Sequence, residues 1–288
     1  MENLHGKNVS FLLLGTLFVS TSGVLGKYIA LPAEAIILCR AILAAVFIYI
    51  FCKIKTIDLK IKSRADFISF IISGFFMGAH WVTYFIALKL SNVALGMLSI
   101  YTFPVITAFL EPFFSKQKLN PVHIFLALIV LIGVYILVPD FSLESNDLKG
   151  ILFGILSAFC YAIRNLTIKK HVKDYNGSAL MLHQMIVVAV LLIPVLFFSD
   201  FSNLQSQIPL LIVVALITTA IGHTMMVHSL KHFTVTTASI ISSVQPIFGI
   251  IIAYLFVNEI PTLHTFIGGS LILSTVVIES FRSGKQTT

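Results

Sequence analysis

The side chains that could do chemistry in this sequence lie inside long apolar runs. His80, Trp81 and Tyr84 share one run, and His223 lies in another. On a helix, positions i and i+3 or i+4 are neighbours, so His80 and Tyr84 share a face and Trp81 lies beside Tyr84. An imidazole, an indole and a phenol in this arrangement can stack on a small molecule and hydrogen-bond to it. The competing interpretation is packing between helices, and for His223 proton transfer is a third role.

Two further runs, residues 87–114 and 229–256, are each broken near the middle by a proline. Pro104 and Pro246 lie 142 positions apart, and several neighbouring residues match at the same offset. A proline leaves the carbonyl four residues earlier without its helical donor. Beside a water-filled cavity such a carbonyl can accept a hydrogen bond from a ligand; otherwise the proline only bends a well-packed helix. The candidate ligand-binding side chains at this depth are Tyr101, Ser243 and Gln245.

Arg40 and Arg164 are the two arginines placed within apolar runs. Arg40 could bind an anionic group of a substrate, pair with Glu34, or extend its head group to the membrane surface. For Arg164, which is nearer the end of its run and close to Lys169, we expect extension to the surface. No run has a carboxylate at its centre, so a carboxylate proton relay is not expected.

The composition indicates an integral membrane protein. Of the 288 residues 58% are hydrophobic and 11% are charged, whereas a soluble domain carries about 25% charged residues. A helix that crosses a bilayer needs ~20 apolar residues, and such runs occur from end to end. The net charge of +7 resides in connections, so it indicates membrane orientation and not a nucleic-acid partner. The lipid bilayer is an expected partner.

The motifs of enzymes are missing from this sequence. It contains no HExxH, no Gly-x-Ser-x-Gly and no phosphate-binding loop. Its three cysteines lie in apolar runs and form no metal-binding spacing. We therefore predict no catalytic residues, no metal site and no cofactor. A membrane scaffold or sensor that transports nothing stays an alternative, and an intramembrane enzyme is a weaker one.

Ten membrane-spanning helices are expected. Their approximate limits are 9–30, 33–52, 66–89, 92–114, 121–139, 149–170, 177–198, 208–230, 234–257 and 261–281. Most of the 19 lysines and arginines fall in the connections on the side of the two termini. Because cytoplasmic loops are enriched in lysine and arginine, both termini are predicted to be cytoplasmic.

The offset of 142 positions indicates an internal duplication, with repeats at residues 8–140 and 148–282. Five spans in each repeat would invert the second repeat relative to the first. Inverted repeats with a substrate site near the midplane are typical of secondary transporters. The sequence thus favours an all-α transporter that moves a small metabolite by alternating access.

One stretch carries a family resemblance, VTTASIISSVQPIFGIIIAYLFVNEIP (235–261), with Pro246 inside the span and Glu259 after it. It resembles the second repeat of the EamA family in the drug/metabolite transporter superfamily. In the first half Gln117 stands where many repeats have the acidic residue. The resemblance implies a permease of the bacterial inner membrane, often an exporter of amino acids or related metabolites. It is consistent with a small-molecule substrate, with protons as one candidate coupling ion, and with a monomer or homodimer.

Overall fold

The computed structural model describes residues 2–115, 121–137, 142 and 144–286. Helices account for nearly all of these residues, and no strand occurs among them. This is what a bilayer requires of long apolar segments, because a helix satisfies its backbone N–H and C=O groups internally where no water is present.

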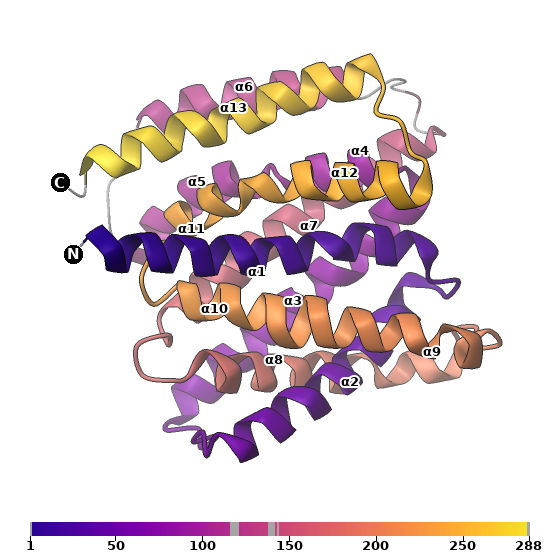
Figure 1. Cartoon of the computed structure of the whole chain (residues 1–288), viewed down its shortest axis with the longest axis vertical. Helices are drawn as coiled ribbons and strands as arrows, with labels where there is room; N and C mark the ends of the chain where they lie inside the picture. The colour runs from indigo at the N-terminus through magenta and orange to yellow at the C-terminus, as the bar shows by residue number, and fades with distance from the viewer. Residues whose placement is uncertain (1, 116–120, 138–141, 143, 287–288) are drawn as a thin grey trace.

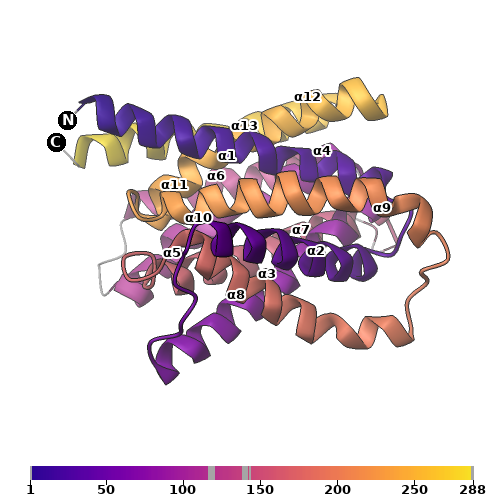
Figure 2. The same ribbon diagram turned by 60° about the horizontal axis from the view of Figure 1, so that its bottom comes forward.

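The spans reverse direction one after another along the chain. The first half contributes α1 (Glu2–Tyr28), α2 (Ala33–Ile54), α3 (Arg64–Leu90), α4 (Val93–Ile100), α5 (Phe103–Ser115) and α6 (Pro121–Leu137). The second half contributes α7 (Asn146–Lys169), α8 (Gly177–Leu192), the 3-10 turn η1 (Ile193–Phe197), α9 (Leu204–Val213), the π-helical segment η2 (Val214–His223), α10 (Thr224–Ser229), α11 (Val235–Ile241), the 3-10 turn η3 (Ser242–Val244), α12 (Gln245–Val257) and α13 (Leu263–Gln286). Both termini consequently lie at the same end of the bundle, here the terminal end (Figure 1, Figure 2). The other end is the far end.

Helices of the two halves interleave. The most extensive helix pairs are α3 with α7 and α8, α6 with α13, α2 with α8, and α1 with η2 and α12, and each pair joins one half to the other. The pair α6 and α13 lies at one edge of the bundle, and α2 and α8 lie at the opposite edge (Figure 1). The halves are therefore not two separate bundles placed side by side, because each covers the inner face of the other.

Eight of the ten predicted spans coincide with helical segments of the described chain that are long and apolar enough to cross a membrane. The fourth of the ten is divided into α4 and α5, and the ninth into α11, η3 and α12. The predicted spans 121–139 and 261–281 correspond to shorter apolar segments, Phe125–Leu137 and Leu263–Thr275.

The outer surface of the bundle is apolar, and its largely hydrophobic interior also holds many polar side chains. Phe75, Phe113, Phe197 and Tyr254 are each more than half exposed, whereas twenty-eight polar or charged residues of the described chain are buried. A water-soluble protein shows the reverse distribution. Polar residues in membrane helices face the bundle interior because lipid offers them no hydrogen bonds.

In each half a lysine side chain caps the C-terminal end of a neighbouring helix. Lys27 Nζ donates to the carbonyl oxygens of Leu88 (3.0 Å) and Ser91 (2.7 Å), at the end of α3. Lys169 Nζ donates to the carbonyls at positions 230 and 233, after α10. A cation there satisfies carbonyls that lack helical donors and offsets the negative end of the helix dipole. The two lysines lie 142 positions apart and bond residues at the same spacing.

Two glycines let α7 approach α3 and α4 closely. A Cβ added at Gly150 would lie 2.6 Å from Ser91 Oγ, and one added at Gly154 would overlap the Ser99 side chain. The two glycines form a Gly-x-x-x-Gly motif, which permits close helix packing in membranes.

We expect the substitution Gly154→Ala to lower the thermal unfolding temperature of the purified protein by several degrees. Overpacking of a tight interior contact costs about 1–3 kcal/mol. Gly78→Ala is the matched control, because its Cβ would lie 3.5 Å from the nearest Val188 atom, an ordinary contact. Equal unfolding temperatures for the two variants would contradict this account of the α7 interface.

Candidate functional site

A small cavity lies where the broken spans meet α1, α3, α7 and η2. Its volume is about 20 Å³, which is room for about one water molecule. The polar side chains that line it include His80, Trp81, Tyr84, Tyr101, His223 and Gln245. These six candidates from the sequence, contributed by both halves of the chain, meet in one place, here the central cavity.

His80 is held in one orientation by α7. Its Nδ1 lies 2.8 Å from Ser157 Oγ, and that hydroxyl donates its own proton to the His80 carbonyl at 2.7 Å. Because the hydroxyl proton is used there, Nδ1 carries the ring hydrogen and donates it to Ser157. The ring also stacks on Tyr161 with 4.4 Å between centroids. Ser157 therefore fixes both the tautomer and the direction of this side chain.

Tyr101 joins the two broken spans across the halves. Its hydroxyl lies 2.8 Å from the Ser242 carbonyl and 2.7 Å from Gln245 Oε1, and its single proton serves one acceptor at a time. Pro246 has no N–H to donate to the Ser242 carbonyl, which accepts instead from the Gln245 N–H in the 3-10 turn. The sequence raised the possibility that this carbonyl accepts from a ligand, but in this structure it faces Tyr101. Pro104 and Pro246 each stand second in the helix that follows the break, α5 and α12, where a missing N–H costs little.

Arg40 is completely buried beside the central cavity. Its Nε donates to Thr219 Oγ1 (2.6 Å) and its Nη1 to Ser22 Oγ (3.3 Å). The guanidinium carbon lies 3.9 Å from the centre of the Trp81 ring, a cation–π contact worth ~2 kcal/mol when desolvated. Arg40 neither reaches the surface nor pairs with Glu34, so both of those alternatives are wrong.

The contact between Arg40 and Thr219 depends on the π-helical segment. Thr219 Oγ1 also bonds to the Val214 carbonyl at 3.1 Å, five residues earlier, as the wider π turn allows. Long π segments are rare and occur often at functional sites. Sequence reasoning missed Thr219 because the run 208–230 has the pattern of an ordinary apolar helix. It also missed Ser22 and Ser157, which are small hydroxyl residues without a distinctive spacing.

Arg164 is buried as well, so the expectation that it extends to the membrane surface is wrong. Its Nε donates to Gln184 Oε1 (2.6 Å) and its Nη1 to Asn165 Oδ1 (2.8 Å). It lines a second cavity of about 20 Å³, which shares Phe103 and Tyr161 with the central cavity. The interior thus holds two guanidinium groups, and no carboxylate in the described part of the chain pairs with either.

Ser243 and Arg40 are the two predicted site residues that do not line the central cavity. The Ser243 hydroxyl donates to the Ser239 carbonyl at 2.9 Å, within its own helix. Arg40 lies behind Ser22 and Trp81, which do line it. No group of three His, Cys, Asp or Glu residues in the described ranges is placed to hold a metal ion.

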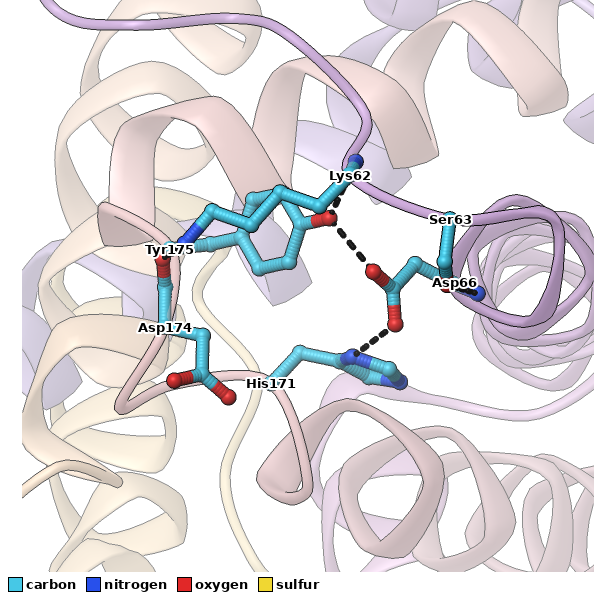
Figure 3. A network of polar contacts seen from close by, with 6 residues as sticks. All are labelled: Lys62, Ser63, Asp66, His171, Asp174 and Tyr175. Carbon is cyan, nitrogen blue, oxygen red and sulfur yellow. Dashed lines mark hydrogen bonds and ion pairs between the residues drawn. The ribbon is translucent and has the colours of Figure 1, made fainter.

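A polar network closes the terminal end between the halves (Figure 3). Tyr175 OH donates to Asp66 Oδ2 at 2.7 Å and accepts from the Lys62 backbone N–H at 2.8 Å. His171 Nδ1 lies 3.4 Å from Asp66 Oδ1. Burial lowers the pKa of His171, although the Asp66 carboxylate opposes that shift. The imidazole is therefore neutral at pH 7, and Tyr175 is the stronger of the two connections to Asp66.

Hydrogen bonds also cross between the halves at the far end. Ser199 Oγ donates to Glu34 Oε1 (2.7 Å), and the Ala30 N–H donates to Gln207 Oε1 (3.0 Å). Glu259 Oε2 accepts from the Val93 N–H at 2.8 Å, at the start of α4. Hydrogen bonds therefore join the two halves at both ends of the bundle.

An acidic residue of each half contacts the start of the other half's broken span. In the second half this is Glu259, and in the first half it is Glu111, whose Oε2 accepts from Thr236 Oγ1 in α11. The carboxylate that contacts α11 therefore comes from position 111. Gln117, where the family resemblance places an acidic residue, lies outside the described residues.

Comparison with known proteins gives consistent matches along the chain. The model of the EamA-like transporter family matches residues 6–138 and again residues 148–281. A Bacillus subtilis protein named "Uncharacterized transporter YxxF" is 23% identical over 280 residues, 95% of this chain and 88% of its own length. The "Pseudopaline exporter CntI" of Pseudomonas aeruginosa is 22% identical over 246 residues, 84% of each chain. One crystal structure superposes with a TM-score of 0.74 at 15% identity, covering 98% of this chain and 99% of the other, and so shares the fold.

The substitution Tyr101→Phe is expected to destabilise the bundle. It removes one of the two hydrogen bonds to the Ser242 carbonyl, which also accepts from the Gln245 backbone N–H. A net hydrogen bond is worth about 0.5–1.5 kcal/mol, so the unfolding temperature should fall by a few degrees. Tyr254→Phe on the exposed face of α12 is the matched control and should change little. A Tyr101→Phe protein as stable as the control would mean that the bond between the halves contributes nothing.

Proposed function

The chain belongs to the EamA-like transporter family, and we propose that it is a secondary transporter that moves a small metabolite by alternating access. The central cavity carries this proposal, because it is lined by both halves and lies among apolar helices whose ends are joined by hydrogen bonds between the halves. A cavity that admits about one water molecule receives a substrate only after the halves separate at one end.

Two inverted repeats, residues 8–140 and 148–282, would be the moving parts, each with five spans that include α6 or α13. The equivalent lysine contacts support this arrangement. Lys27 closes a helix at the far end, and Lys169 makes the same contact at the terminal end. Inverted repeats place equivalent contacts on opposite sides of a membrane. The two lysine contacts likewise lie at opposite ends of the bundle.

Opening of the far end would separate Glu34 from Ser199 and Val93 from Glu259, while the Asp66–Tyr175 network holds the terminal end closed. Opening of the terminal end would do the opposite. Each set of contacts is modest in free energy, since a net hydrogen bond is worth ~1 kcal/mol. A bound substrate could therefore shift the balance between the two open states.

The terminal end is proposed to face the cytoplasm of a bacterial inner membrane. It carries many basic residues, in agreement with the enrichment of lysine and arginine in cytoplasmic loops; those in the described part are Lys7, Lys53, Lys55, Lys60, Lys62, Arg64, Lys169, Lys170, Lys173, Lys231, Arg282 and Lys285. Export is the favoured direction, because one relative is named as an exporter. The aromatic wall of Trp81, Tyr84 and Tyr161 opposite Gln245 suits an amphipathic metabolite.

Overexpression in a bacterial host should change the composition of the growth medium. We expect at least one metabolite to accumulate outside cells that make the wild-type protein, measured by mass spectrometry. Trp81→Ala, His223→Ala and Gln245→Ala should each abolish the accumulation, whereas Tyr254→Ala, on the exposed face, should preserve it. Accumulation that survives all three cavity substitutions would remove the cavity from the transport path. A medium that never changes would favour a scaffold or sensor.

Linking the halves at the far end should arrest transport. In a background in which Cys39, Cys52 and Cys160 are replaced by alanine, Glu34→Cys and Ser199→Cys would be joined by a short reagent with two maleimide groups. The identified metabolite should then cross proteoliposome membranes at least tenfold more slowly, because this end can no longer open. Either single cysteine with the same reagent is the control. Full transport by the linked protein would contradict alternating access.

A further inference from the structure

Several buried polar side-chain atoms around the central cavity have no partner in the described chain. Trp81 Nε1, Tyr84 OH and His223 Nδ1 are buried and unpartnered, and all three residues line this cavity. Arg40 Nη2, just behind them, is also unpartnered. Leaving a buried polar group unsatisfied costs about 1–3 kcal/mol, and more if it is charged. Trp81 Nε1 and Arg40 Nη2 can only donate, and Tyr84 OH and His223 Nδ1 are able to donate, so a ligand group that accepts several hydrogen bonds would satisfy all four atoms.

The charge of the interior indicates the sign of that group. Arg40 and Arg164 are buried, and neither pairs with a described carboxylate. Neither cavity has an aspartate or glutamate in its lining. An isolated buried charge costs several kcal/mol unless an opposite charge accompanies it. Arg164 has Gln184, Asn165 and Met181 as partners for its three nitrogens, whereas Arg40 keeps one nitrogen free.

We propose that the transported metabolite is an organic carboxylate without a protonated amino group, and that its carboxylate binds to Trp81, Tyr84 and His223 against the charge of Arg40. This proposal rests on the proposed function and names the chemical class of its substrate. A carboxylate offers two oxygens and about four acceptor positions, which matches the number of unpartnered nitrogen and oxygen atoms.

A zwitterionic amino acid or an amine fits this cavity less well. Its ammonium group would find no carboxylate in the lining. An aromatic ring can bind an ammonium group through its face in place of a carboxylate. The Arg40 guanidinium, however, already lies over the ring of Trp81. The apolar part of a carboxylate can instead lie against Val19, Phe103 and Tyr161, which line the same cavity.

Trp81 supplies the readout, because it is the single tryptophan of the chain. The full-length protein in nanodiscs would be titrated at pH 7 with three probes that share one carbon skeleton. These are 2-hydroxy-4-methylpentanoate, an anion; leucine, a zwitterion; and leucinamide, a cation. Lactate is a fourth probe, an anion with a shorter carbon chain. We expect saturable changes in Trp81 fluorescence with the two anions, and at least tenfold weaker responses with leucine and leucinamide.

Variants that keep Trp81 test the assigned contacts. Arg40→Gln should abolish the response to the anions, and Arg40→Lys should restore part of it. If Arg40→Gln does not fold, Tyr84→Phe removes one donor and keeps the ring, and should weaken binding by about tenfold. Tyr254→Phe is the matched control. An unchanged affinity in Tyr84→Phe, or in folded Arg40→Gln, would overturn the assignment.

Flux measurements separate this inference from the proposed function. Anion binding in nanodiscs without anion flux in proteoliposomes would support the carboxylate site and contradict transport of that anion. Tighter binding of leucine or leucinamide than of the hydroxy acid would overturn the carboxylate inference and leave the transporter proposal intact. The lack of a saturable response to both anions would also overturn it.

Discussion

The guanidinium group of Arg40 is a buried positive charge, and the arrangement of the helices around it depends on satisfying that charge. A charge in a low-dielectric interior needs hydrogen bonds and an electron-rich neighbour if no carboxylate is near. Here Thr219, Ser22 and the Trp81 ring serve these purposes. They come from η2, α1 and α3, so the position of Arg40 on α2 requires four spans to meet at one depth. The central cavity lies beside Arg40, where α1, α3 and η2 meet the broken spans and α7.

The same requirement explains why the two halves interleave. The broken spans leave backbone carbonyls that lipid could not satisfy. In the second half the Ser242 carbonyl accepts from Tyr101 of the first half as well as from the Gln245 N–H. Arg40 of the first half donates to Thr219 of the second half and to Ser22 of its own. Each of these polar groups thus has partners in both halves. Contacts at the two ends of the bundle are simpler hydrogen bonds, which can be exchanged for bonds to water when one end opens.

Much of the fold and part of the candidate site could be predicted from residue spacing. The other features of the site could not, for physical reasons. Apolar runs of sufficient length predict eight of the spans, and mid-span polar residues such as His80 and His223 point to the cavity. The π-helical segment has no apolar period of its own, so the bond from Arg40 to Thr219 was not foreseeable. Arg164 lies near the end of its span, yet Gln184 and Asn165 satisfy it inside. Which helices become neighbours depends on packing between the halves, which a single sequence does not reveal.

Quenching of Trp81 fluorescence by iodide tests alternating access around this residue. In proteoliposomes with one orientation of the protein, iodide would be added outside, then enclosed inside. We expect quenching of Trp81 from each side, since the cavity opens to one side and then the other. We also expect the link between Glu34→Cys and Ser199→Cys to remove quenching from the far-end side only. Quenching from neither side, or from one side whether or not the link is made, would contradict alternating access.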